Sequence, residues 1–282
     1  MAEMVLTAKK AGYAVGQFNF SNLELAQAAL EAAEELRAPL ILGVTEGGLR
    51  HMGVEFAAAI GLTAARQAKV PVSLHLDHAG SFDLIMSCIK AGFNSVMFDG
   101  SRLPIEENIR MTKEICRVAH AMGVSVEAEV GAIGGVEDDL SVAAADALVA
   151  DPEEAVNFWQ QTKVDALAVA VGNAHGMYKT IPNIRTDIVQ AVAGAIPVPV
   201  VLHGGSGTPD DIIRRAIAAG CAKINVSTEN QVAFTSTLRR LLTEDPELAD
   251  SRKCLGPARA VVKGSIKERI TVFGAAGKAV VG

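Results

Sequence analysis

Eight short apolar segments recur along the chain, and segments with the amphipathic spacing of helices lie between them. Continuous runs of Val, Ile, Leu and Ala are typical of parallel strands that are buried on both faces. Strands that alternate with helices in this way indicate an α/β fold built on a parallel sheet. The expected strands are Tyr13–Phe18, Leu40–Val44, Val72–Leu76, Ser95–Phe98, Ser125–Val130, Ala166–Val171, Val198–Leu202 and Lys223–Val226.

Amphipathic spacing predicts helices in most of the intervening segments. Glycine follows several of them, at Gly92, Gly123 and Gly220, as expected where a helix ends in a left-handed residue. The expected helices include Leu23–Leu36, Phe82–Ala91, Ile105–Ala121, Pro152–Thr162, Ile188–Val192 and Pro209–Ala219.

Eight strand–helix units predict an α/β fold of the closed (β/α)8 TIM-barrel type. A doubly wound open sheet is the alternative, but no G-x-G-x-x-G motif follows the first strand, where a dinucleotide fold carries its phosphate turn. No low-complexity tract or Pro/Ser-rich linker divides the 282 residues, half of which are hydrophobic. We therefore predict a single domain over residues 1–282.

Composition and charge exclude several classes of partner. The net charge is −6 and no block of Lys or Arg stands out, which argues against nucleic acid. No apolar run approaches the roughly 18 residues of a membrane helix, and the N-terminus does not resemble a signal peptide. The four cysteines form no C-x-x-C pair, as expected of a reduced protein. We expect a cytoplasmic protein that binds neither nucleic acid nor membrane.

Polar or ionisable residues stand at or just beyond nearly every predicted strand end. In barrels the catalytic groups lie at the carboxyl ends of the strands. Core packing alone does not explain such a pattern, which instead predicts a ring-shaped active site. These residues are Asn19, Thr45, Asp77, His78, Asp99, Glu129, His175, His203 and Asn225, and Asn19 is expected to contact substrate.

Three of the six histidines, His78, His175 and His203, are each interpreted as following a predicted strand directly. A barrel would bring these strand ends to one mouth. A lone histidine at a strand end is more often a hydrogen-bonded structural residue, but three at separate ends favour a metal. Three neutral imidazoles with one open coordination position form a catalytic zinc site, so we predict one Zn²⁺ there. Strand alternation predicts that His75 points into the barrel beside Asp77.

Two segments predict a phosphate site. Residues 203–207, His-Gly-Gly-Ser-Gly, follow the seventh strand, and residues 225–228, Asn-Val-Ser-Thr, follow the eighth. Barrels frequently bind phosphate with these two loops. Glycine lets backbone N–H groups approach the phosphate oxygens. The alternative is that the glycine-rich segment is only a flexible turn and the Ser-Thr segment only a helix cap. The predicted contacts are Gly204, Gly205, Ser206, Asn225, Val226, Ser227 and Thr228.

Carboxylates suited to proton transfer occur at two places. Asp77 adjoins a predicted metal ligand, and Glu137 lies in a glycine-led acidic loop that could close over substrate. A solvated surface loop is the alternative for this segment. Glu127 and Glu129 alternate in the fifth strand and share a face, where they could pair with barrel-lining cations or lie near the metal.

Seven stretches of the chain carry motifs that are informative when they are taken together. They are residues 13–19, 74–78, 125–131, 134–138, 174–176, 203–207 and 223–230. Together they resemble the class II, zinc-dependent ketose-bisphosphate aldolases, and the resemblance runs from Tyr13 to Lys278. It implies a carbon–carbon lyase in which His78, His175 and His203 bind zinc.

The resemblance also implies roles for other residues. Asp77 would be the acid/base at the C4 hydroxyl of the ketose, and Glu137 would handle the proton at C3. Arg252 is similar to an arginine that reaches the far phosphate from a neighbouring subunit, in a homodimer or homotetramer. The dihydroxyacetone phosphate half would be bound, with a monovalent cation (Na⁺ or K⁺) nearby, by Gly176, Gly204, Ser206, Asn225, Ser227 and Thr228.

The predicted substrate is a phosphorylated ketose, with fructose 1,6-bisphosphate favoured. The products would be dihydroxyacetone phosphate and glyceraldehyde 3-phosphate. Residues 203–207 and 228–231 resemble fructose-bisphosphate aldolases, whereas residues 172–178 and 135–139 resemble tagatose-bisphosphate aldolases. Tagatose 1,6-bisphosphate and 6-phospho-5-dehydro-2-deoxygluconate are therefore alternatives. Another barrel metalloenzyme, such as a sugar-phosphate epimerase, and a non-catalytic sugar-phosphate-binding barrel are rival functions.

Overall fold

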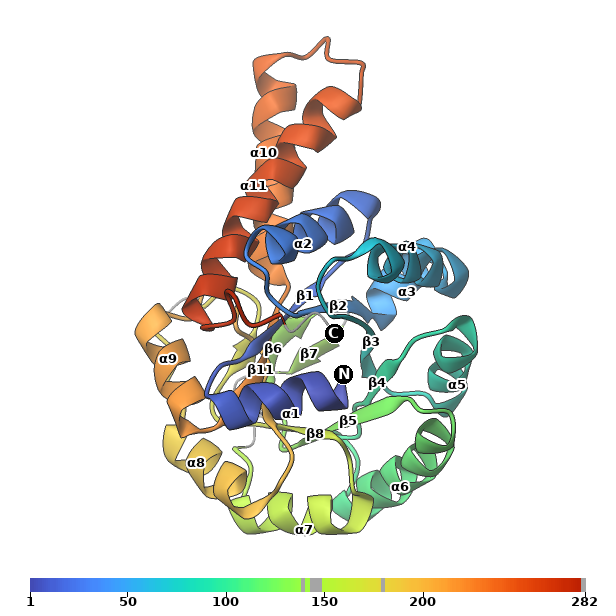
Figure 1. Ribbon diagram of the computed structural model, residues 1–282, viewed down its shortest axis with the longest axis vertical. Helices are drawn as coiled ribbons and strands as arrows, with labels where there is room; N and C mark the ends of the chain where they lie inside the picture. The colour runs from blue at the N-terminus through green and yellow to red at the C-terminus, as the bar shows by residue number, and fades with distance from the viewer. Residues whose placement is uncertain (138–139, 143–148, 179–180, 280–282) are drawn as a thin grey trace.

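A computed structural model shows a closed barrel of eight parallel strands, as predicted (Figure 1). The structure describes residues 1–137, 140–142, 149–178 and 181–279. The strands follow one another around the barrel in chain order, and β1 closes the ring by pairing with β11. They are β1 (Val15–Asn19), β2 (Leu40–Thr45), β3 (Val72–Ala79), β4 (Ser95–Phe98), β5 (Ser125–Val130), β8 (Ala166–Val169), β10 (Val200–Leu202) and β11 (Cys221–Val226).

Three predicted strands are longer than the observed ones. The first begins at Val15, not Tyr13, and the other two are shorter for identifiable reasons. The sixth ends at Val169, not Val171, because the N–H of Val171 donates to the Asn173 side chain instead of a neighbouring strand (2.9 Å). The seventh begins at Val200, not Val198, because Pro199 has no N–H to donate to the ladder. The fourth and fifth strands have the predicted bounds.

Helices surround the barrel (Figure 1). The predicted glycine C-caps are confirmed: Gly92, Gly123 and Gly220 all have positive φ. Three predicted helices (α5, α6 and α7) have the expected bounds. Helix α8 is longer at both ends than the predicted Ile188–Val192. The helices are α1 (Ala2–Ala11), α2 (Leu23–Glu35), α3 (Glu46–Met52), α4 (Val54–Gln67), α5 (Phe82–Ala91), α6 (Ile105–Ala121), α7 (Pro152–Thr162), α8 (Thr186–Ala195), α9 (Asp210–Ala219), α10 (Thr228–Glu244) and α11 (Arg252–Val272).

Helix α1 lies across the amino-terminal end of the barrel (Figure 1). The N–H of Ala2 donates to Ser125, the first residue of β5 (3.0 Å), and Met1 packs against residues that fill the barrel interior, including Met97 and Ala168. With this end covered, the carboxyl ends of the strands form the open mouth.

Helices α10 and α11 form an antiparallel hairpin that projects from the barrel (Figure 1). Helix α11 packs along both α10 and α2, and it begins at the far end of the hairpin. Helix α10 begins directly after β11, at the barrel mouth. The hairpin therefore connects the mouth to a point well outside the barrel.

A small second sheet adjoins the barrel. It contains β6 (Gly134–Glu137), β7 (Leu140–Val142) and β9 (Ala174–His175). Strand β9 pairs in parallel with β6, with His175 opposite Gly135. This sheet joins the segment after β5 to the segment after β8.

Candidate active site

Three histidines meet at the carboxyl end of the barrel. One nitrogen from each of His78, His175 and His203 lies within 4.8 Å of the other two. The His78 ring centroid lies 4.5 Å from that of His203 and 4.8 Å from that of His175, with the rings edge to face. The predicted cluster is therefore formed by residues up to 125 positions apart in sequence.

The three histidines reach the cluster in different ways. His203 follows β10 directly, as predicted, and His78 lies within β3, which is longer than expected. The prediction that His175 directly follows a barrel strand is wrong. Strand β8 ends at Val169, and His175 lies in β9, where pairing with β6 holds it over the mouth.

His78 has an unusual backbone conformation. Its φ is 49°, and the pairing of β3 with β4 shifts register between Leu76 and Ala79. Positive φ is rare for residues other than glycine and costs energy, so the surrounding structure must maintain it. The bulge places the imidazole inside the mouth, where it is 5% exposed.

Two carboxylates determine which imidazole nitrogens face the cluster. Asp99 lies 2.9 Å from His78 Nδ1, and Glu127 Oε1 lies 3.0 Å from His203 Nε2. Each carboxylate accepts an N–H, which leaves His78 Nε2 and His203 Nδ1 with lone pairs. These two nitrogens lie 2.7 Å apart. Burial, followed by the charge on His78, lowers the pKa of His203 and favours the neutral form that binds metal.

The triad fits a zinc ion. Nitrogens at about 2.0–2.1 Å from a tetrahedral zinc would lie roughly 3.3 Å from one another. His78 Nε2 and His203 Nδ1 are 2.7 Å apart, and one nitrogen of each of the three histidines lies within 4.8 Å of the others, so small shifts would bring them to that spacing. Neutral imidazoles oriented by carboxylates are the ligand set of catalytic zinc sites.

Asp77 lies beside the triad and is completely buried. Its two oxygens accept hydrogen bonds from the side-chain amides of Asn19 (2.8 Å) and Asn225 (3.2 Å). Burial alone would raise the pKa of Asp77, but positive charge, from His78 and His203 when they are protonated and from Lys223, lowers it well below its usual range. The carboxylate is therefore ionised, which is the form that a general base requires.

A buried ion pair lies beneath the cluster of His78, His175 and His203, the predicted metal ligands. Lys223 Nζ, in β11, lies 2.9 Å from Glu127 Oε2, and neither side chain is exposed. Burial opposes ionisation of Glu127, but the Lys223 charge and the His203 hydrogen bond lower its pKa to about 2. His75 points inward beside Asp77, as predicted, and burial and then Lys223 lower its pKa to about 3. In the sequence, Lys223 could have been noticed as the single lysine at the start of the predicted strand Lys223–Val226.

Glu129 also lies near the predicted metal position. Its Oε2 is 3.9 Å from His78 Nδ1, and His78, Asp99 and Glu129 form a second group whose ligand atoms lie within 4.8 Å. Burial, and then the charge of Asp99, raise the pKa of Glu129 well above its usual range. A neutral carboxyl group therefore lies beside an ionised one.

The glycine-rich turn, residues 204–208, follows His203 and lies beside the start of α10. Gly204 has a φ of 67°, and a Cβ there would lie 2.1 Å from the Ala174 carbonyl oxygen. Only glycine fits this close approach. The N–H of Gly205 donates to the Asn225 carbonyl (2.9 Å), so this donor is already satisfied.

Ser206 joins the turn to the N-terminus of α10. Its hydroxyl oxygen accepts hydrogen bonds from the backbone N–H groups of Ser227 (3.2 Å) and Glu229 (3.3 Å). N–H groups at a helix N-terminus readily bind phosphate. The side chain of Val226 packs in the core, so only its backbone can contact a ligand.

Two side chains that the sequence did not single out hold the His175 segment against the turn. Asn173 donates to the His203 carbonyl (3.0 Å), and the Tyr178 hydroxyl donates to the Gly204 carbonyl (3.1 Å). Tyr178 also accepts from the Ala174 N–H (2.8 Å). These bonds lie on either side of the predicted contact Gly176. In the sequence, the feature that could have indicated them is an Asn before and a Tyr after His175-Gly176.

Two predicted residues are not among the contacts described above. Glu137 is the last residue of β6, and its side chain lies outside the described part of the structure. Arg252 begins α11 at the far end of the hairpin, where it is 89% exposed and paired with Asp250 (2.9 Å). Arg252 therefore lies at the end of the hairpin that projects from the barrel, since it begins α11 (Figure 1).

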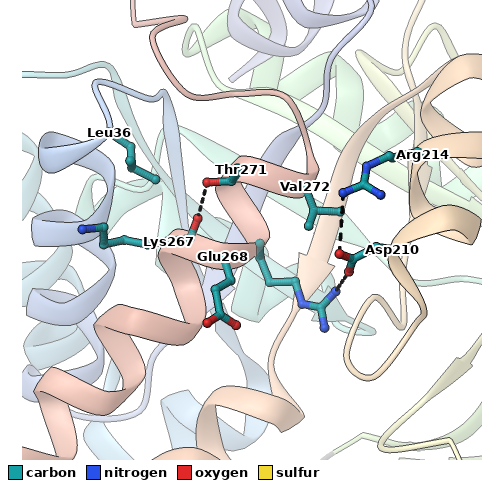
Figure 2. A pocket seen from close by; sticks show the side chains of 8 residues that line it. Leu36, Asp210, Arg214, Lys267, Glu268, Thr271 and Val272 are labelled. Carbon is teal, nitrogen blue, oxygen red and sulfur yellow. Dashed lines mark hydrogen bonds and ion pairs between the residues drawn. The ribbon is translucent and has the colours of Figure 1, made fainter.

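A groove of about 450 Å³ lies on the outside of the barrel between α9 and α11. Figure 2 shows Asp210 and Arg214 on one side of it and Lys267 and Thr271 on the other. Acidic and basic side chains alternate there, which favours no ligand of a single charge. Among the described residues, no helix is long and apolar enough to span a membrane.

Comparisons with known proteins agree with this geometry. The family model for class-II fructose-bisphosphate aldolases matches residues 1–278. Two relatives named fructose-bisphosphate aldolase, from Geobacillus stearothermophilus and Staphylococcus aureus, are each 46% identical over 99% of this chain and 98% of their own.

Solved structures give the same result. The YdjI aldolase from Escherichia coli K12 has a TM-score of 0.87 at 35% identity and covers 99% of this chain and 98% of its own. A putative fructose-1,6-bisphosphate aldolase from Coccidioides immitis has a TM-score of 0.87 at 27% identity, over 98% of this chain and 96% of its own. This chain therefore belongs to the class-II fructose-bisphosphate aldolase family of zinc-dependent lyases.

Proposed function

We propose that this aldolase reversibly cleaves fructose 1,6-bisphosphate to dihydroxyacetone phosphate and glyceraldehyde 3-phosphate. The observation that carries the proposal is the ionised carboxylate of Asp77 beside the triad, in the same mouth as the glycine-rich turn. The full-length similarity to relatives named for this activity supports it. The chain would act as one domain, residues 1–282, in the cytoplasm.

The proposed cleavage needs a base, a stabilised negative charge and an acid. Asp77 accepts the proton of the C4 hydroxyl, and the C3–C4 bond breaks to release glyceraldehyde 3-phosphate. The electron pair of that bond moves into the remaining three-carbon unit, and Glu137 delivers a proton to C3. One zinc ion per subunit, bound by His78, His175 and His203, supplies Lewis-acid stabilisation of the developing charge.

We assign phosphate binding to the two loops after β10 and β11. The N–H groups and hydroxyls at these positions would fix the dihydroxyacetone phosphate half over the metal, and Asn19 would contact the sugar. A monovalent cation, Na⁺ or K⁺, would neutralise charge nearby. Gly205, whose N–H is bonded to the Asn225 carbonyl, would shape the turn, and Val226 would contribute its backbone alone. The assigned residues are Gly176, Gly204, Gly205, Ser206, Asn225, Val226, Ser227 and Thr228.

Arg252 would act on a neighbouring subunit in a homodimer or homotetramer. Its exposed position at the end of the projecting hairpin supports this, because the side chain can contact a second chain far from its own mouth. There it would bind the phosphate on C6 of the substrate.

One experiment tests the substrate and the metal together. The kcat/KM of one zinc-loaded preparation is compared for fructose and tagatose 1,6-bisphosphates, which differ in configuration at C4. We expect higher kcat/KM for the fructose ester, loss of cleavage with a chelator, and no inhibition by borohydride. A preference for the tagatose ester or for 6-phospho-5-dehydro-2-deoxygluconate would reassign the substrate, and epimerisation without triose phosphate release would refute the reaction.

A further inference from the structure

The glycine-rich turn is held from two directions. On the side of the metal cluster, Asn173 and Tyr178 contact the carbonyls of His203 and Gly204. On the other side, the turn is bonded to two residues of the projecting hairpin, Glu229 in the first turn of α10 and Arg269 in α11. Neither of these residues belongs to the proposed catalytic or substrate-binding set.

Glu229 contacts the turn through both its backbone and its side chain. Its N–H donates to the Ser206 hydroxyl (3.3 Å), and its Oε2 accepts the N–H of Gly207 (3.0 Å). Gly207 has a φ of 70°, a conformation that glycine adopts readily. A hydrogen bond from an N–H to a carboxylate is stronger than one to a neutral acceptor. Glu229 therefore fixes the turn at Gly207, where the backbone of the turn has the most conformational freedom.

Arg269 completes the connection. Its Nε donates to Glu229 Oε1 (2.7 Å), and one terminal nitrogen donates to the Thr208 carbonyl (3.3 Å) and to Asp210 (3.2 Å). The side chains of Arg269 and Glu229 are only 19% and 11% exposed, so water screens this pair less than an ordinary surface pair. The guanidinium therefore bonds both the carboxylate that fixes the turn and the turn itself.

We propose that Glu229 and Arg269 are positioning residues that hold turn 204–208 in the shape that accepts phosphate. The inference rests on the proposed function, because it requires substrate phosphate to bind at this turn. A turn that is ordered before binding loses less conformational freedom when the ligand arrives. Removing either residue would therefore weaken phosphate binding without changing the groups that carry out cleavage.

The test uses three variants and a matched control. Glu229→Gln keeps the size of the side chain but leaves one acceptor oxygen for two donors, Gly207 and Arg269. Arg269→Gln removes the charge, and Arg269→Lys keeps it without the planar fork. The control is Arg214→Gln, because Arg214 borders the same outer groove and pairs with Asp210 (3.6 Å) without contacting the turn (Figure 2).

Two binding measurements are made on the zinc-loaded enzyme. They are the Kd of inorganic phosphate by calorimetry and the KM for fructose 1,6-bisphosphate. We expect both to rise about 5- to 10-fold in Glu229→Gln and Arg269→Gln, which is about 1.4 kcal/mol at tenfold. The kcat should stay within about twofold of wild type, because the lost binding is shared by the ground state and the transition state. Arg269→Lys should be intermediate, and Arg214→Gln should match wild type.

Three outcomes decide the matter. Lower unfolding midpoints with unchanged phosphate Kd and KM would show a purely structural role and overturn the inference alone. Equal effects in Arg214→Gln would also overturn it, because general surface charge would then be responsible. If wild-type enzyme binds no inorganic phosphate and Ser206→Ala leaves KM unchanged, the phosphate assignment itself fails, and the positioning role fails with it.

Discussion

The metal cluster and the glycine-rich turn lie in the same barrel mouth but are held in place differently. The cluster is supported from inside the barrel by charged groups that are completely buried, above all Glu127 and Lys223. The turn is supported from outside, by the partly exposed Glu229 and Arg269 of the hairpin. One mouth therefore combines a histidine cluster supported by buried charges with a glycine-rich turn supported by peripheral helices.

The largest expected effect comes from removing the base of the metal region. Asp77→Ala should reduce kcat about 10³-fold, because loss of a general acid/base group typically costs 10²- to 10⁴-fold. Zinc content should stay at wild-type level, since the triad is intact. Steady-state kinetics and metal analysis check both statements. Asp187→Ala, an exposed ion-pair residue, is the control, and retained turnover in the Asp77 variant would refute the assignment.

Breaking the buried pair should have the next largest effect. Lys223→Met leaves Glu127 charged and without its cation, which should lower the free energy of unfolding of the zinc-free protein by about 3–5 kcal/mol. Urea denaturation measures this. The double change Glu127→Leu with Lys223→Met should be less destabilised than Lys223→Met alone. Equal or greater loss in the double variant would show that the pair acts by shape and not by charge.

Ser206→Ala tests the turn itself. Loss of the hydroxyl leaves the N–H groups of Ser227 and Glu229 without this acceptor and removes one donor that we assign to phosphate. We expect KM to rise about tenfold with little change in kcat, since about 1.4 kcal/mol of binding would be lost in both the ground and transition states. Ser236→Ala, on the exposed side of α10, should behave as wild type. A large fall in kcat would place Ser206 in the chemical step.

Tyr178→Phe should have the smallest effect and addresses the join between the two regions. The change removes the bonds to Gly204 and Ala174 and should lower the free energy of unfolding by about 1 kcal/mol. KM should rise no more than about twofold, because Asn173 remains. Tyr13→Phe, at the opposite end of the barrel, is the control. A tenfold change in KM would mean that the inner bonds, and not α10 and α11, dominate the turn.

The barrel and most of the metal site could be predicted from local patterns. Apolar strands, glycine caps and histidines near strand ends are encoded in short stretches, so β4, β5, His78 and His203 were found directly. The placement of His175 was not, because the short strand β9 depends on pairing with β6. Lys223 and Arg269 were missed for a related reason: their partners lie 96 and 40 residues away.

The left-handed backbone of His78 has a consequence for how this sequence can change. At a φ of 49°, glycine would relieve about 1 kcal/mol of local cost. Selection for thermal stability alone would therefore tend to replace a residue whose imidazole is proposed to bind zinc. Because the proposed zinc site needs this imidazole, a stabilised redesign of the enzyme should keep histidine here despite its conformational cost.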